Sequence, residues 1–118
     1  MSYDVTFVYP GTEDIIEFDE PHHLIGGTYR LGGTPKAWLN ITYNYSKHYR
    51  DIWNMSLNDM HGWTIEQTKP YIEQGIRELG ITRSDNYWEA TSGNAGAALA
   101  DLLILMVRCP SDAQMLVR

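Results

Sequence analysis

The chain has 118 residues, of which 43% are hydrophobic, 20% charged and 12% aromatic, and its formal net charge is −6. These values exclude a disordered, collagen-like or coiled-coil chain and indicate one globular domain over residues 1–118. No apolar run approaches the roughly 18 residues that span a bilayer, so we expect no membrane segment and no membrane partner. The single cysteine, Cys109, excludes an internal disulfide and indicates a reducing, intracellular setting.

The net negative charge lies entirely in the first 20 residues, which hold six acidic residues and no lysine or arginine. The arginines elsewhere are scattered and form no basic run that would bind a phosphate backbone, so we expect no direct contact with nucleic acid. The acidic segment is either a solvated edge that keeps the protein soluble or a surface for a basic partner. The candidate partner-binding residues are Glu13, Asp14, Glu17, Asp19 and Glu20.

Apolar and polar residues alternate over residues 3–9, which predicts a half-buried strand. The turn sequence at residues 10–12 then predicts a hairpin, whose second strand contains Ile15, Ile16 and Phe18 and ends at Pro21. Residues 26–35 place a short strand-like piece between two glycine pairs, which we interpret as a bent strand or a flexible loop. Residues 38–42 predict a further strand.

From Tyr43 onward the periodicity becomes helical. A first helix is predicted by an apolar stripe at Tyr45, Tyr49, Ile52 and Trp53. A second helix begins at the capping-box sequence 64–67 and ends at Gly80, and Pro70 inside it predicts a kink or a shortened first turn. Residues 94–107 predict a buried third helix, whose small residues permit close approach by another element, and residues 113–117 predict a closing strand.

These elements predict an α+β fold, with an N-terminal antiparallel sheet packed on one face against three C-terminal helices and completed by the closing strand. The leucine-rich end of the third helix adds an expectation about assembly. If the monomer leaves this apolar surface uncovered, the protein forms a homo-oligomer.

Reactive side chains give no recognisable catalytic motif. His22 and His23, next to Asp19 and Glu20, would share a metal with His48 or His61 only if the segment were a loop, because neighbours on a strand point to opposite faces. Cys109 has the setting of a packing residue, and Asp85, Glu89 and Asp101 would need to converge near the start of the third helix. The sequence indicates no bound metal and no cofactor.

Polar and aromatic residues gather at two junctions that precede helices. Free backbone N–H groups there attract an anion, amide side chains form hydrogen bonds, and aromatic rings stack on a planar ligand. The same residue types also cap helices and pack against cores, so both interpretations remain open. The candidate ligand-binding residues are Asn40, Thr42, Tyr43, Asn44, Tyr87, Trp88 and Asn94.

Three segments carry a family resemblance. They are Asn40-Ile41-Thr42-Tyr43-Asn44, the turn with Tyr87, Trp88, Gly93 and Asn94, and Pro110-Ser111-Asp112. Over roughly residues 38 to 118 the chain resembles a family of small phage-encoded proteins of unknown function. The resemblance implies an origin in a phage and a place in the cytoplasm of a bacterial host, and it lends no catalytic residue.

Three functions are compatible with these observations. The first is a non-enzymatic phage accessory protein that counteracts host defence by sequestering a small nucleotide-derived ligand at the helix N-termini. The second is an acidic inhibitor that covers a basic, nucleic-acid-binding surface of a host defence nuclease. The third is a small enzyme with an unfamiliar site built on Asp85, Glu89 and the histidines.

Overall fold

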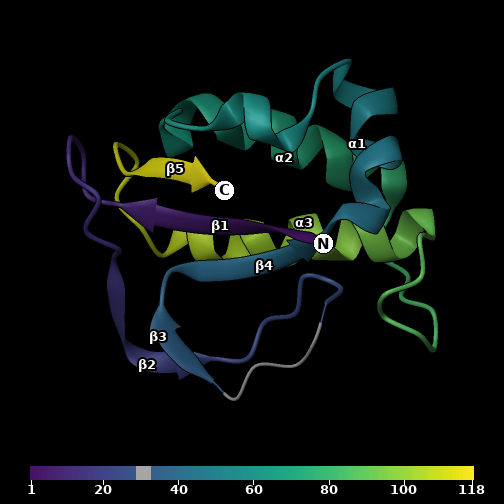
Figure 1. Cartoon of the computed structure of the whole chain (residues 1–118), viewed down its shortest axis with the longest axis horizontal. Coiled ribbons are helices and arrows are strands. Elements are labelled where there is room, and N and C mark those ends of the chain that lie inside the picture. Colours follow the sequence, from purple (N-terminus) through teal and green to yellow (C-terminus); the bar gives the residue numbers. More distant parts are fainter. Residues whose placement is uncertain (29–32) are drawn as a thin grey trace.

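The structure is a computed structural model that describes residues 1–28 and 33–118 (Figure 1). It has the α+β fold that the sequence predicts. In chain order the elements are β1 (Ser2–Val8), β2 (Glu17–His22), β3 (Thr34–Lys36), β4 (Trp38–Thr42), the 3-10 helix η1 (Tyr43–Tyr45), α1 (Ser46–Trp53), the 3-10 helix η2 (Leu57–Met60), α2 (Ile65–Leu79), α3 (Ser92–Val107) and β5 (Gln114–Val117).

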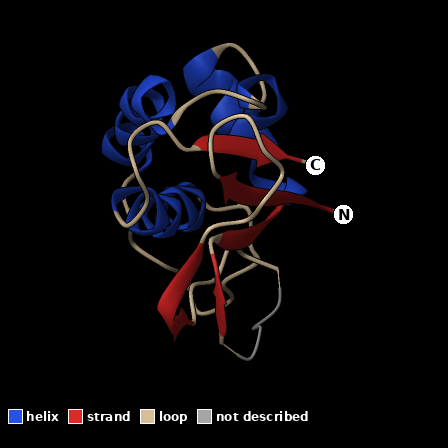
Figure 2. Cartoon of the chain, turned by 90° about the vertical axis from the view of Figure 1, so that its left-hand side faces the viewer, coloured by secondary structure: helices blue, strands red, loops and turns tan. Residues whose placement is uncertain are grey.

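β1 is the central strand of an antiparallel sheet of order β4-β1-β5. Val5 pairs with Leu39 on one side and with Val117 on the other. The alternation along β1 buries Tyr3 and Val5 and leaves Asp4 on the opposite face. The helices cover only the first of these faces, and the β2–β3 pair projects from the body (Figure 2).

The helices pack through small residues. At Gly75 of α2 a Cβ would lie 2.5 Å from Leu99 Cδ1 of α3, and at Gly96 it would overlap the backbone of Gly80. The small residues of the third helix therefore permit the close approach that the sequence predicts. The three predicted helices are confirmed, although α3 begins two residues earlier than predicted, at Ser92. Pro70 does not shorten the first turn of α2, since the helix begins at Ile65, directly after the Thr64 cap.

The predicted hairpin is wrong except for the pairs next to its turn. Tyr9 N donates to Asp14 O at 3.1 Å, and Val8 forms an isolated bridge with Ile15. The chain then leaves β1, and β2 pairs with β3 instead. β4 occupies the side of β1 that the second hairpin strand would need, and Phe7 N donates to Ala37 O at 2.9 Å. The place beside β1 that the hairpin would need is therefore filled by a segment more than 20 residues further along the chain.

Two smaller predictions also change. Pro21 does not end the second strand, since β2 continues to His22. In the glycine-rich segment, Gly26 and Gly27 bridge to Ile41 at the edge of β4, and β3 follows at Thr34–Lys36. Residues 29–31 of the strand-like piece predicted between the two glycine pairs lie outside the described residues. In the described part of the chain no helix is long and apolar enough to cross a membrane.

Candidate functional site

The first junction is the passage from β4 through η1 into α1. Thr42 caps η1, since its Oγ1 accepts a hydrogen bond from Asn44 N at 3.2 Å. Tyr43 N donates to Met1 O at 3.2 Å, and the Tyr43 ring meets the edge of Tyr3 with centroids 4.4 Å apart. These contacts fix the junction to the first residues of the chain.

The second junction is the loop before α3, which Asn94 holds together from inside. Its side chain is 1% exposed, Oδ1 accepts from Ser84 N at 3.0 Å, and Nδ2 lies 2.9 Å from Ser84 Oγ and from Asn86 O. Thr91 caps α3 by accepting from Asn94 N at 3.1 Å. The loop is therefore preformed and does not depend on a ligand for its shape.

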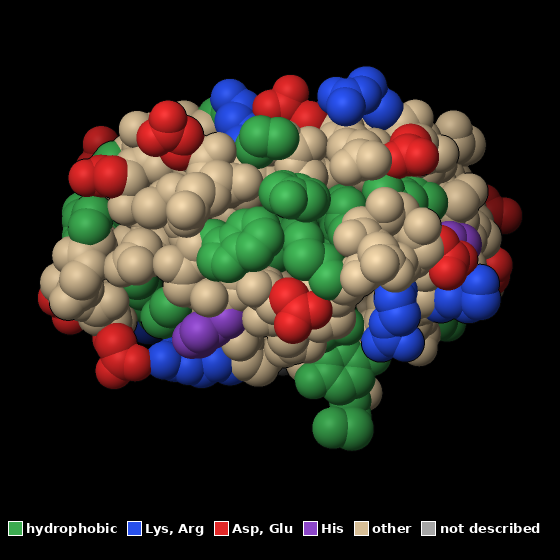
Figure 3. All heavy atoms as spheres, turned by 90° about the horizontal axis from the view of Figure 1, so that it is seen from above, with side chains coloured by type: hydrophobic (Ala, Val, Ile, Leu, Met, Phe, Trp, Pro, Cys, Tyr) green, Lys and Arg blue, Asp and Glu red, His purple; other side chains and the backbone are tan. Residues whose placement is uncertain are grey.

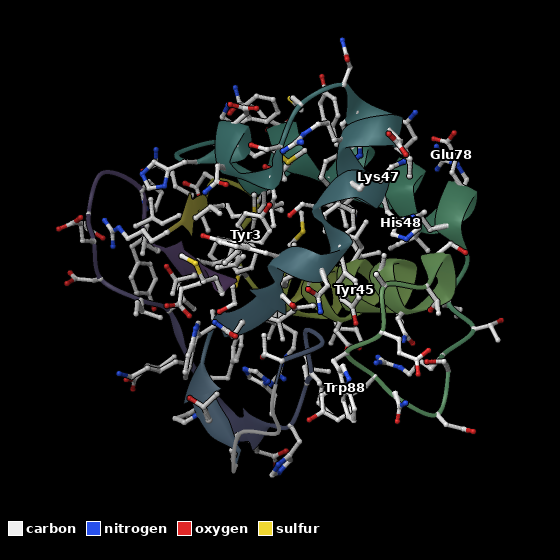
Figure 4. All side chains as sticks on the ribbon, turned by 45° about the vertical axis from the view of Figure 1, so that its right-hand side comes forward. Tyr3, Tyr45, Lys47, His48, Glu78 and Trp88 are labelled. Atoms are coloured by element: carbon white, nitrogen blue, oxygen red, sulfur yellow. The ribbon has the colours of Figure 1, made fainter. Side chains whose placement is uncertain are left out.

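The structure brings the two junctions together, although more than 40 residues separate them in the sequence (Figure 4). Three side chains of η1 and α1 bond backbone carbonyls of the loop. Asn44 Nδ2 donates to Trp88 O at 3.2 Å, Tyr45 Oη donates to Tyr87 O, and His48 Nε2 lies 2.8 Å from Ala90 O. A carbonyl only accepts, so His48 carries a proton on Nε2.

Aromatic rings remain half-exposed where the junctions meet. Trp88 is 48% exposed and Tyr43 is 37% exposed, and Tyr87 packs edge-on against the Trp88 ring with centroids 5.0 Å apart. A hollow of about 330 Å³ lies beside them. It is lined by Met1, Ser2, Gly27, Thr28, Thr42 and Trp88. We call Tyr43, Asn44, Tyr87, Trp88 and the residues lining this hollow the junction surface.

Tyr45 contacts both the loop before α3 and Gly27 of the glycine pair at residues 26–27. Burial raises the pKa of the Tyr45 phenol to about 12, so it stays protonated and donates to the loop. Gly27 has φ +87° and packs against the Tyr45 ring so closely that a Cβ would overlap it. The sequence predicted a bent strand or a flexible loop at this glycine pair, and it did not connect Gly27 and Thr28 with the two junctions.

Of the seven predicted ligand-binding residues, only Thr42 and Trp88 line the hollow, and two others, Asn40 and Asn94, are buried. Asn94 is buried and its amide is occupied by the loop, as described above. Asn40 is also buried, and its Nδ2 donates to Asp4 Oδ1 at 2.8 Å in the sheet. In both cases the protein itself provides the partner that the sequence assigned to a ligand.

The acidic residues lie at the other end of the long axis from the loop before α3 (Figure 1). All five candidate partner-binding residues are exposed. Glu13 Oε1 accepts from Arg118 at 2.6 Å, and the Arg108 guanidinium lies 4.2 Å from the centroid of the Phe18 ring. The remaining side chains, Asp14, Glu17, Asp19 and Glu20, have no ion pair within residues 1–28 and 33–118.

The candidates for metal binding and catalysis are held by other contacts. The buried His22 has Nε2 2.9 Å from Lys36 O, and its Nδ1 accepts from Leu24 N at 3.3 Å. Asp101 lies within α3 and pairs with Arg83 at 2.9 Å, whereas Glu89 accepts from Asn86 at 2.6 Å, so these acids have separate partners. Among the described residues no three His, Cys, Asp or Glu side chains are placed to hold a metal ion.

Comparison with known proteins adds no relative. No protein-family model, no curated protein and no solved structure matches this chain.

Proposed function

We propose that the protein is a non-enzymatic binding protein that captures a small, planar, nucleotide-like ligand at the junction surface. The observation that supports this best is the meeting of the two junctions, which places the half-exposed Trp88 ring beside a preformed hollow. A rigid site of this kind binds without the entropic cost of ordering a loop. With the origin that the family resemblance implies, such a protein would counteract host defence by sequestering a nucleotide-derived signal.

Stacking is the main contribution that the junction surface offers. The indole of Trp88 provides a large apolar face for a planar ring, and the Thr42 hydroxyl adds a polar contact in the same hollow. The helix start there is a weaker site for an anion, because Met1 O, Thr42 Oγ1 and Tyr43 O accept the N–H groups of Tyr43, Asn44 and Ser46.

An anionic group has a better place at the start of α3. A hollow of about 410 Å³ lies there, lined by residues that include Arg83, Ser92 and Gly93. The helix dipole favours negative charge at this point, and the Arg83 guanidinium, which pairs with Asp101 through one nitrogen, has further N–H donors. The hollow at the two ends of the 82–93 segment therefore favours a ligand that carries phosphate groups over a neutral one.

A thermal-shift screen against linear and cyclic nucleotides and ADP-ribose derivatives tests this function. A ligand at one hundred times its dissociation constant stabilises the fold by about 2.7 kcal/mol, which raises Tm by several degrees. Intact recovery of the bound compound separates sequestration from catalysis.

Matched variants locate the site. Tyr43→Ala and Trp88→Ala should each reduce the affinity for a hit about fivefold or more, since base stacking contributes about 1–3 kcal/mol. Tyr71→Ala is the control, because Tyr71 is also 37% exposed but lies on α2. Absence of any hit, or hits that Tyr43→Ala and Trp88→Ala leave unchanged, contradicts the proposal.

A second function is favoured by the exposure of the acidic residues. The side chains of Asp14, Glu17, Asp19 and Glu20 are free of ion pairs in the described part of the chain and lie on a segment that projects from the body. They would match the basic surface of a host defence nuclease. Complex formation with such a nuclease should weaken steeply with salt and be lost when Glu17, Asp19 and Glu20 are replaced by lysine. Under this function Trp88→Ala has no effect.

A further inference from the structure

The face of the sheet that the helices do not cover contains a groove of about 460 Å³. Two rows of side chains cross its floor. In the first row, Thr6 pairs with Trp38 on one side and with Leu116 on the other. In the next row, Asp4 pairs with Asn40 and forms backbone hydrogen bonds with Arg118. The groove is lined by Asp4, Thr6, Glu13, Ile15, Thr34, Lys36, Trp38, Leu116 and Arg118. It shares no lining residue with the junction surface.

Asp4 lies in this groove with a fixed orientation. Its Oδ1 accepts from Trp38 Nε1 at 3.0 Å and from Asn40 Nδ2 at 2.8 Å. Both donors are neutral, so they position the carboxylate without cancelling its charge. Within residues 1–28 and 33–118 Asp4 has no ion pair, and its Oδ2 has no hydrogen-bond partner.

The buried amide of Asn40 supports the same conclusion. Its Oδ1 is inaccessible to solvent and has no hydrogen-bond partner in the described part of the chain. Turning the amide round would place this oxygen against the Asp4 carboxylate, which the charge forbids. The Asn40 amide therefore donates to Asp4 and leaves its own buried oxygen without a hydrogen bond. The unpaired oxygen costs about 1–3 kcal/mol of stability, which packing alone does not explain.

The rest of the groove adds one positive charge and an apolar strip. Lys36 is exposed and has no ion pair among the residues that the structure places, whereas Arg118 is paired with Glu13. Ile15, Leu116 and Trp38 provide the apolar part of the lining. The groove thus presents an oriented carboxylate, an ammonium group and an apolar surface in one small volume.

We propose that this groove binds a free amino acid with an apolar side chain. The α-ammonium group bonds Asp4 Oδ2, the carboxylate meets Lys36, and the side chain packs on Trp38, Ile15 and Leu116. The groove volume lies at the lower end of the roughly 300–1,000 Å³ typical of small-molecule sites, which suits a ligand of this size. This site goes beyond the nucleotide-like ligand proposed above and does not depend on it.

Amide and indole NMR spectra of the whole protein, titrated with amino acids, test this proposal. The probes are L-phenylalanine, L-leucine and L-methionine, with N-acetyl-L-phenylalanine, which lacks the ammonium group, and L-phenylalaninamide, which lacks the carboxylate. We expect saturable shifts of the Trp38 indole N–H and of the Thr6 and Leu116 amides with at least one free amino acid. N-acetylation should weaken binding by about tenfold or more, since it removes a charge-assisted hydrogen bond.

Variants assign the two charges. Asp4→Asn should weaken the binding of phenylalanine by about tenfold or more, and Lys36→Met should make phenylalanine and phenylalaninamide bind equally. Asp14→Asn, an exposed carboxylate outside the groove, is the matched control. The absence of saturable shifts with every free amino acid, or equal binding after N-acetylation, overturns the proposal. If Asp4→Asn fails to fold, the modified probes on the natural protein still decide between these outcomes.

Discussion

Asparagine has three different roles in this chain, and the surroundings of each amide decide which. Asn44 is exposed and tethers the loop before α3, Asn40 orients a carboxylate in the sheet, and Asn94 holds the loop from inside. All three are asparagines close to the start of a helix. Only the tertiary contacts separate an amide that is available to a ligand from one that the protein has already used.

The buried contacts of Asn94 predict a measurable loss of stability when its side chain is removed. Asn94→Ala leaves Ser84 N and several loop oxygens without their partner, so we expect a loss of about 2–3 kcal/mol in the free energy of unfolding. Urea denaturation followed by tryptophan fluorescence measures the loss. Asn58→Ala, at an exposed position in η2, should stay within about 0.5 kcal/mol of the natural protein. Equal stability of the two variants would show that the Asn94 contacts do not hold the loop.

Cys109 should be an unreactive thiol. Burial raises its pKa from the ordinary 9.0 to about 11, so the thiolate fraction at neutral pH falls about a hundredfold. Alkylation by iodoacetamide should therefore be slow and reach half its maximal rate near pH 11, and in urea this midpoint should return to about 9. Because the folded thiol keeps its proton while the unfolded one loses it, stability should fall as pH rises from about 9 to about 11. Mass spectrometry follows the reaction, and a folded-state midpoint below pH 9 would contradict the burial argument.

At the scale of the elements, local sequence signals predicted the helices well and the strand partners poorly. Helix ends are set by nearby residues, and the Thr64–Gln67 capping box forms both of its hydrogen bonds. Strand pairing depends on segments far away in the chain, so the alternation in β1 identified its buried face but not β4 and β5 as its partners.

The candidate site shows the same division. The sequence marked both junctions because their residue types cap helices and stack on rings. It did not predict that Asn44, Tyr45 and His48 bond the loop at residues 87–90, because these contacts depend on how α1 lies against α3. The sheet groove gave no sequence signal, since its residues lie on β1, β3, β4 and β5, at Arg118 and in the loop after β1.

The start of α2 provides a test of local stability. Thr64→Ala removes the acceptor for Gln67 N and should lower the free energy of unfolding by about 1 kcal/mol, which lowers Tm by about 4 °C in a chain of this size. Thr64→Ser keeps the hydroxyl and is the matched control, expected to melt close to the natural protein. Differential scanning calorimetry measures both variants. If the serine variant loses as much as the alanine variant, packing of the threonine methyl group, and not the cap, stabilises this end of α2.

Both outer strands of the three-stranded sheet are bridged by another segment, and the helical side carries the apolar surface. Gly26 and Gly27 bridge to the outer edge of β4, and Thr64 bridges to the outer edge of β5. Figure 3 shows hydrophobic side chains gathered near the centre of the face seen from above. The rings of Trp63 and Tyr71 at the start of α2 contact each other with centroids 5.5 Å apart. These bridges hinder edge-to-edge pairing at β4 and β5, and the exposed apolar side chains of the helices offer a surface for association.

The exposed end of α3 predicts a dimer. Val107 is 62% exposed and Ile104 is 44% exposed, and Val107 lies at a groove of about 510 Å³ that also contains Ile65 and Pro70. A symmetric pair of such surfaces would bury apolar area on both subunits, and stable dimers bury about 800 Å² on each. Sedimentation should therefore give twice the 13.5 kDa mass of one chain, and Val107→Glu should return it to the monomer. Tyr71→Glu places the same charge on α2, and dimer loss with that variant alone would assign the interface to α2 instead of α3.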